Sequence, residues 1–336
     1  MVETRAQLEV QFAKKIDLII DQLVYSEFSE EDINTFTETV KTFLKFIDLR
    51  QYILDALYDK VKETANVIKP HDVTRYSSFQ KLLRVVIKLE DQDLIDTLES
   101  FFLKDRKIKP FFLLLQEQIS LGKDIKQSEK LFLSALNTYY NIDLDIINEY
   151  LGIIGQDKSY MVRRLMDKKI VVHNALAKYV AAVSLADKEA TEQHLVPVIV
   201  QEFDGDATSY MSLCGIIITH RPEFADVLLR GNKHDVRDRF SAFVVRNHLN
   251  DIMLIVGYCI YLTLNNQKEF ERFEKEFISI AKPEQLLTYS RYVLNSSRRK
   301  ILRRLVDLKT EDSRNEKHLV SFIQYFPEFG SLLPML

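Results

Sequence analysis

The residues that interrupt helices and shape tight turns are scarce in this sequence. It has only eight glycines and seven prolines among 336 residues, well below the average usage of roughly 7% and 5%. Turn-rich β proteins and disordered chains both need many such residues. Convincing alternation of apolar and polar residues, the pattern of a half-buried strand, is missing as well. The scarcity therefore favours an all-α protein with many helices joined by short loops.

Cysteine is rare, tryptophan is absent, and neither sign of charge is in large excess. Two cysteines are too few for a disulfide framework, and Cys214 and Cys259 each lie in an apolar stretch, where a small core residue is expected. With 46 basic and 49 acidic residues the net charge is −3, so composition gives no general attraction to nucleic acid or anionic membranes. Any such binding must come from a local patch.

Features that direct a chain to or through a membrane are also missing. Residues 1–15 contain no apolar region of the kind found in signal peptides. No apolar stretch reaches the ~20 residues that a membrane-spanning helix needs. We therefore expect a cytoplasmic protein that does not span a membrane. A secreted protein that uses no cleaved N-terminal signal has the same features.

The most specific stretch is IMLIVGYCIYLTL at 252–264, which is apolar on every side of any helix it forms. A helix without a polar face is expected to be buried in a protein core. A shorter stretch of the same kind lies at 211–218, and aligning the two places Gly215 opposite Gly257, a spacing of 42 residues. HEAT-type helical repeats have roughly this period. Because further copies are missing, an irregular HEAT-like α-solenoid and a large multi-helix bundle both remain open.

Periodicity and capping residues predict about 15 helices. Ser29, which precedes three acidic residues, is expected to cap one of them. The segment 159–186 is expected to form one long helix or a kinked pair. Leucine and isoleucine residues at three-, four- and seven-residue steps predict a single helix over 284–308.

The chain is long enough for one large domain or two ordinary ones. A division is expected near 155–158, after Gly155, or near the turn at 204–206. The first of these gives an N-terminal array of helical hairpins at 1–155. The remainder, 156–336, is expected to be a C-terminal helical array around a buried helix at 252–264. One continuous domain is the alternative.

The densest positive patch lies on the helix expected at 284–308. At 100° per residue, most of its cations fall opposite the apolar face, where they could bind phosphates of nucleic acid or of acidic lipids. The other interpretation is a solvated face whose cations stabilise the C-terminal end of the helix. Proteins that bind single-stranded nucleic acid need aromatic residues between their cations for base stacking, and the patch lacks them. The patch consists of Arg291, Arg298, Arg299, Lys300, Arg303 and Arg304.

Two His-Asp dyads, at 71–72 and 234–235, resemble the metal-binding pair of the HD superfamily of metal phosphohydrolases. Those all-helical enzymes combine the dyad with a separate histidine and a distant aspartate, because imidazoles and carboxylates together hold metals that activate water. The plainer interpretation is that the second dyad begins a helix. For that dyad the resemblance implies the ligands His220 (or His194), His234, Asp235 and Asp251.

Short motifs of known catalytic or nucleotide sites are absent: there is no HExxH, GxxxxGK[ST], GxGxxG or GxSxG. A helical array without catalytic residues suits a binding surface, although fold and function are linked only by association. We therefore predict a non-enzymatic scaffold or adaptor that binds another protein and needs no cofactor. The alternatives are a module that binds phosphate backbones or acidic lipids through the basic patch, and an HD-like metal-dependent phosphohydrolase.

Overall fold

The computed structural model describes residues 29–45, 47–68, 73–167 and 174–335, with some positions between 11 and 21. Within these residues the chain forms nineteen α-helices, four short π or 3₁₀ segments and no strand. The prediction of an all-α protein is confirmed, and the helices are somewhat more numerous than the expected 15. In the same part of the chain, none combines the length and the apolar character that crossing a bilayer requires.

The described residues divide into two compact units, one up to Gln156 and one from Asp157 onward. Each unit has its own buried side chains and its own sequence of packed helices. The expected domains at 1–155 and 156–336 stay a prediction, because compactness does not show that either unit folds alone.

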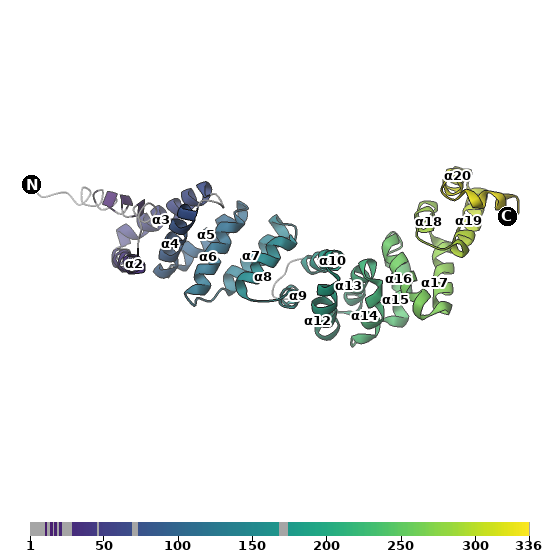
Figure 1. Cartoon of the computed structure of the whole chain (residues 1–336), viewed down its shortest axis with the longest axis horizontal. Coiled ribbons are helices and arrows are strands. Elements are labelled where there is room, and N and C mark those ends of the chain that lie inside the picture. Colours follow the sequence, from purple (N-terminus) through teal and green to yellow (C-terminus); the bar gives the residue numbers. More distant parts are fainter. Residues whose placement is uncertain are drawn as a thin grey trace, which may run out of the picture. The chain divides into compact units, whose positions relative to one another are not determined.

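Unit 1 is an array of helices that pack in the order of the chain (Figure 1). The helices are α2 (Glu30–Leu44), α3 (Ile47–Val67), α4 (Val73–Leu89), α5 (Gln92–Lys104), α6 (Ile108–Ser120), α7 (Lys126–Tyr139) and α8 (Leu144–Ile154). The largest contacts join α2 to α4, α4 to α6 and α5 to α7. Helices two apart in the chain thus lie in one row, which is typical of an α-solenoid.

Local signals in the sequence begin and end these helices. Ser29 accepts a hydrogen bond from the backbone N–H of Asp32, whose carboxylate accepts one from the backbone N–H of Ser29. This capping box confirms the expected cap of α2. Asp91 caps α5 through the N–H of Leu94, and Gly155 ends α8 in the left-handed conformation that glycine tolerates best.

The core of unit 1 is rich in aromatic rings. Phe111 of α6 stacks on Phe132 of α7 with ring centroids 5.7 Å apart, and Phe132 lies 4.3 Å from Tyr150 of α8. All three side chains are fully buried. The Tyr150 hydroxyl donates to Glu129 at 2.9 Å, so its polar end is satisfied inside the core.

Unit 2 continues with shorter helices. They are α9 (Lys158–Met166), α10 (Ala175–Ala186), α11 (Lys188–Ala190), η1 (Thr191–Leu195), α12 (Val196–Glu202), α13 (Ala207–His220), η2 (Pro222–Phe224), α14 (Ala225–Gly231), α15 (Arg237–Asn247), α16 (Ile252–Asn265), α17 (Gln267–Ile280), α18 (Pro283–Ser290), α19 (Asn295–Glu311), η3 (Ser313–Asn315), α20 (Glu316–Tyr325) and η4 (Pro327–Met335). Contacts link α10, α13, α16, α18 and α20 into one row, and α15, α17 and α19 belong to a second row.

The structure divides one expected helical segment and corrects another. The segment 159–186 contains the separate helices α9 and α10, and residues 168–173 lie outside the described part. The single helix expected over 284–308 is two helices, because residues 291–294 form a turn before α19 begins at Asn295. Asparagine and the two serines after it favour the start of a helix over its interior.

Candidate functional site

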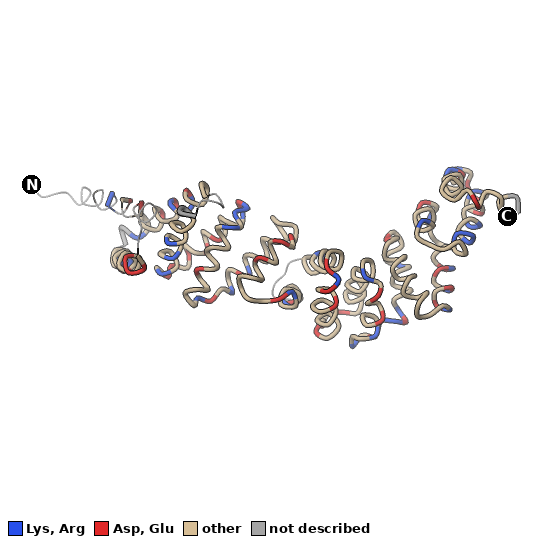
Figure 2. The backbone as a smooth tube through the Cα atoms, viewed as in Figure 1, with Lys and Arg blue, Asp and Glu red and all other residues tan. Residues whose placement is uncertain are grey.

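Three neighbouring helices of unit 2 carry almost no charge. α13 and α16 contain no Asp, Glu, Lys or Arg, and α10 contains only Lys178. Figure 2 shows α16 tan along its length, although 28% of the whole chain is charged. Because α13 packs against both α10 and α16, their outward sides form one continuous surface. We call the part formed by α13 and α16 the uncharged face; its more exposed apolar residues are Ile216, Met253, Ile260 and Leu264.

Two glycines bring α13 and α16 close together. A Cβ atom on Gly257 would lie 2.4 Å from the carbonyl oxygen of Ile218, closer than any real contact allows. A Cβ atom on Gly215 would meet only the side chain of Leu254, at 3.2 Å. The backbone of α16 therefore packs directly on that of α13, which a side chain at position 257 would prevent.

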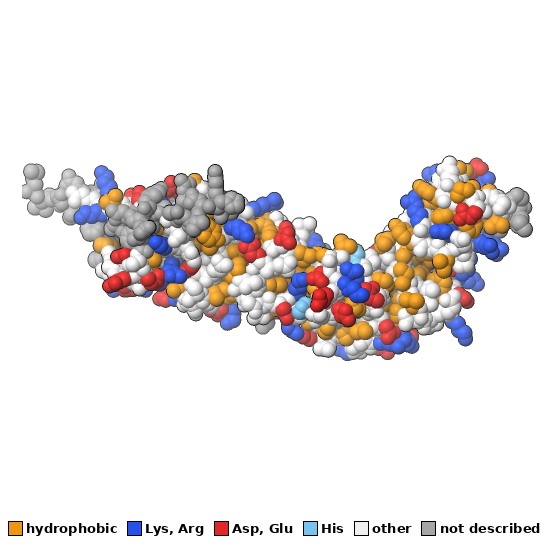
Figure 3. All heavy atoms as spheres, in the orientation of Figure 1, with side chains coloured by type: hydrophobic (Ala, Val, Ile, Leu, Met, Phe, Trp, Pro, Cys, Tyr) orange, Lys and Arg blue, Asp and Glu red, His pale blue; other side chains and the backbone are white. Residues whose placement is uncertain are grey.

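The outward side of α16 is apolar and accessible to solvent. The relative exposures of Met253, Ile260 and Leu264 are 44%, 46% and 79%, and these positions share one side of the helix. The prediction that the helix at 252–264 is buried on every side is therefore wrong. It lies in a row of helices, so its neighbours and the second row cover the remaining sides. Figure 3 shows hydrophobic side chains over this region of unit 2.

Hydroxyl groups near the uncharged face donate to their own helices. Ser212 and Thr219 of α13 donate to the carbonyl oxygens four residues earlier, at 3.0 and 2.8 Å, and Thr263 of α16 does the same at 2.8 Å. A partner that covers these hydroxyls therefore leaves no donor without an acceptor. The free-energy cost of removing water from them is lower than for hydroxyls that donate to water.

The inward side of α16 is tightly packed. Tyr258 lies between Phe240 and Phe273, with ring centroids 5.0 and 5.1 Å away. The Cys259 thiol lies 3.3 Å from the Tyr289 hydroxyl, and burial raises the pKa of Cys259 to about 12. A buried thiol that stays protonated is a poor nucleophile. Its neighbours thus confirm the expected role of Cys259 as a core residue.

Most cations of the predicted basic patch contact other side chains of this protein. Arg291 lies in the turn between α18 and α19, over the ring of Tyr325 at 4.4 Å. Arg298 lies over the ring of Phe326 at 4.2 Å and donates to the carbonyl oxygen of Ser290 at 3.0 Å. These two arginines hold the end of α20, and their guanidinium planes are covered by aromatic rings.

Two further cations of the patch are paired with carboxylates. Lys300 lies 2.6 Å from Glu274 and Arg304 lies 3.0 Å from Glu311. Arg299 and Arg303 are exposed and have no hydrogen bond or ion pair with any described residue. Of the six cations of the patch, the structure thus leaves two free arginines, one turn apart. Binding of phosphates by this patch stays a prediction.

The second His-Asp dyad lies in a turn. Nε2 of His234 is 2.9 Å from the carbonyl oxygen of Gly205, and Asp235 has a φ of 36°. The interpretation that the dyad begins a helix is wrong by two residues, because α15 begins at Arg237. The first dyad, at 71–72, lies outside the described residues.

The remaining residues of the metal hypothesis have local roles. The carboxylate of Asp251 accepts the N–H of Leu254 at 3.1 Å and caps α16. Burial lowers the pKa of His220, and the nearby charge of Arg221 lowers it further. Among the described residues, no three His, Cys, Asp or Glu side chains are placed together to hold a metal. The HD-like hypothesis stays a prediction that this geometry does not strengthen.

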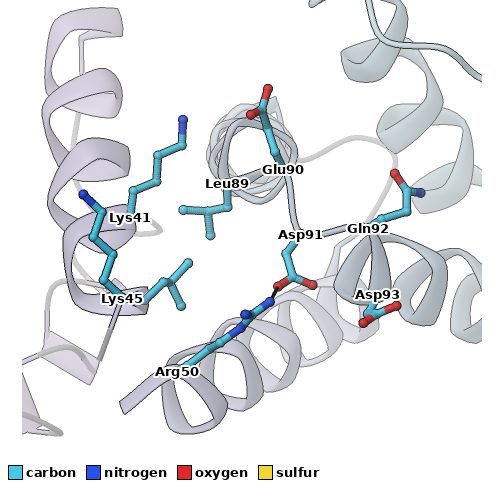
Figure 4. A pocket seen from close by; sticks show the side chains of 9 residues that line it. Lys41, Lys45, Arg50, Leu89, Glu90, Asp91, Gln92 and Asp93 are labelled. Atoms are coloured by element: carbon cyan, nitrogen blue, oxygen red, sulfur yellow. Dashed lines mark hydrogen bonds and ion pairs between the residues drawn. The ribbon is translucent and has the colours of Figure 1, made fainter. Parts of the chain in front are cut away.

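A recess in unit 1 lies between the ends of α2 and α4 and the starts of α3 and α5 (Figure 4). Its volume is about 330 Å³. Lys41 and Lys45, at the end of α2, belong to its lining, and Arg50 binds Asp91 at 2.9 Å. Its charged side chains balance, with three cations against the three carboxylates of Glu90, Asp91 and Asp93. The recess therefore offers no surplus charge to a ligand.

Comparison with known proteins identifies no relative. The sequence matches no protein-family model, and the searches of curated proteins and of solved structures returned no match.

Proposed function

We propose that this protein is a non-enzymatic scaffold or adaptor, and that the uncharged face binds a partner protein. The observation that supports the proposal is the exposed apolar side of α16, next to the equally uncharged α13. The cytoplasmic location expected from the sequence is part of the proposal.

The energetics of the face favour protein binding. Burying the exposed part of one large aliphatic side chain contributes about 1 to 2 kcal/mol, and Met253, Ile260 and Leu264 supply three such groups in one stripe. No carboxylate or ammonium group on α13 or α16 must lose its hydration on contact. A partner with its own apolar stripe, such as one side of an amphipathic helix, fits this surface.

The test is affinity purification of the full chain from its own cell, at low and at high salt. Wild type is compared with Ile260→Glu/Leu264→Glu, which puts two carboxylates on the face. The control is Val227→Glu/Val320→Glu, which changes exposed apolar residues of α14 and α20. We expect a stoichiometric protein that survives high salt, that the control retains and that the face variant loses. Retention of that protein by the face variant would contradict the proposal, as would recovery of only salt-sensitive nucleic acid or lipid.

A further inference from the structure

A second recess lies in unit 2, where α14, α15, α16 and α17 meet. Its volume is about 290 Å³, and the chain surrounds it more closely than the recess in unit 1. The buried rings of Tyr258 and Tyr261 belong to its lining. Arg230, Arg237 and Arg272 approach it from three different helices. No pattern in the sequence groups these arginines, because they are spread over more than 40 residues.

Most N–H groups of the three guanidinium ions remain available to a ligand. Arg237 donates one hydrogen bond, from Nε to Asp238 at 3.2 Å, and Arg272 donates one, from Nη2 to Glu269 at 2.6 Å. Nε of Arg230 lies 3.1 Å from a carboxylate oxygen of Asp226. A guanidinium group has five N–H donors. Each partner is a residue of the same helix, one to four positions away, and exposed pairs of this kind are worth little.

Two of the three arginines lie near one hydroxyl group of the recess, that of Tyr261. The Tyr261 hydroxyl donates to Asp226 at 3.1 Å. Burial raises the pKa of Tyr261 and so does this bond, whereas the positive charges of Arg230 and Arg237 oppose the rise. Both guanidinium groups are therefore close enough to one hydroxyl to influence it. α15 begins beside them, and no side chain caps its N-terminus.

We propose that this recess binds a phosphate group. Arginine forks recognise the oxygen atoms of phosphate in pairs, and several arginines can hold one group from different directions. The carboxylates of Asp226, Asp238 and Glu269 balance the charge of the three arginines, so a phosphate would be held by the unused N–H donors and not by surplus charge. A volume near the lower limit of small-molecule pockets suits one phosphate group rather than a whole nucleotide. The site is separate from the uncharged face and does not depend on its function.

The test is calorimetric titration of the full chain at physiological salt, with inorganic phosphate in one arm and a phosphoserine peptide in the other. Arg230→Gln/Arg237→Gln removes two of the guanidinium groups, and Arg272→Gln alone removes the third from a different helix. The control is Arg246→Gln/Lys275→Gln, which removes the same charge from exposed positions on α15 and α17 outside the recess. We expect both recess variants to weaken binding at least tenfold and the control to bind like wild type.

The two arms distinguish the source of the phosphate. Saturable binding of inorganic phosphate identifies a small phosphate compound, and binding of the phosphopeptide alone identifies a phosphorylated residue of another protein. Failure of both probes to bind wild type would overturn the proposal. It would also be overturned if the control weakened binding as much as the recess variants, because the effect would then be one of net charge. Unfolding curves of all variants establish that the comparison is made between folded proteins.

Discussion

The ammonium group of Lys300 lies 2.6 Å from the carboxylate of Glu274, whose side chain is completely buried. The other oxygen of Glu274 accepts a hydrogen bond from Tyr289 at 3.3 Å, and the Tyr289 hydroxyl in turn contacts the Cys259 thiol. Side chains of α16, α17, α18 and α19 thus form one polar chain inside unit 2. A residue predicted to bind external phosphate instead neutralises an internal carboxylate.

We expect Lys300→Met to reduce the free energy of unfolding by about 1 to 3 kcal/mol, because it leaves a buried charge without its partner. The matched control is Lys309→Met, on the same helix. Lys309 pairs with Glu316 at 2.8 Å where both side chains are well exposed, so its loss should cost less than 1 kcal/mol. Urea unfolding measures both values. Equal costs for the two variants would show that the internal pair has no special role.

The closeness of α13 and α16 makes a second prediction. Gly257→Ala would place Cβ 2.4 Å from a backbone oxygen of Ile218, and we expect it to destabilise the protein by about 1 to 3 kcal/mol. Gly215→Ala meets a side chain that can move, so its cost should be smaller. Gly152→Ala, in α8, meets no atom within 4 Å and should stabilise by about 0.5 to 1 kcal/mol. Thermal unfolding of the three variants gives the order, and a Gly257→Ala protein as stable as wild type would contradict the packing.

The sequence predicts those features of the structure that depend on residues close together in the chain. Features that depend on contacts between distant helices have no such local signal. Caps such as Ser29 depend on residues three positions away and were predictable. The break at 291–294 also has a local signal, in Asn295 and the serines after it, but the apolar periodicity on either side hid it. The exposure of Ile260 had no local signal, because it depends on which sides of α16 other helices cover. Two uncharged helices 42 residues apart do indicate neighbours in a row, and that was the signal that could have revealed the face.

The pH dependence of stability can be predicted at Glu99, which is fully buried in α5. One oxygen accepts from Gln118 and Ser128, and the other has no partner in the structure. Burial raises the pKa of this carboxyl. The folded state therefore holds a proton more tightly than the unfolded state does, and the stability it contributes at low pH is lost as pH rises through the folded pKa.

Glu99→Gln removes this ionisation while keeping an oxygen that can accept both hydrogen bonds. We expect the variant and wild type to be similarly stable in acid. As pH rises above the unfolded pKa, the variant should gain relative to wild type, by up to ~1.4 kcal/mol for each pH unit until the folded pKa is passed. Urea unfolding at several pH values tests this. A difference that does not change with pH, or that changes in the opposite direction, would refute the assignment.

The divided basic patch gives the last prediction. Arg298→Gln removes the guanidinium over Phe326 and its bond to Ser290, so it should destabilise the end of α20 by about 1 to 2 kcal/mol. Arg299→Gln, at the next position, changes the charge equally but loses no contact with a described residue, and should leave stability within ~0.5 kcal/mol of wild type. Hydrogen exchange of α20 locates the effect. If the patch were a phosphate-binding surface despite its internal contacts, Arg299→Gln would instead weaken binding of the chain to acidic vesicles or nucleic acid at low salt while its unfolding curve stayed unchanged.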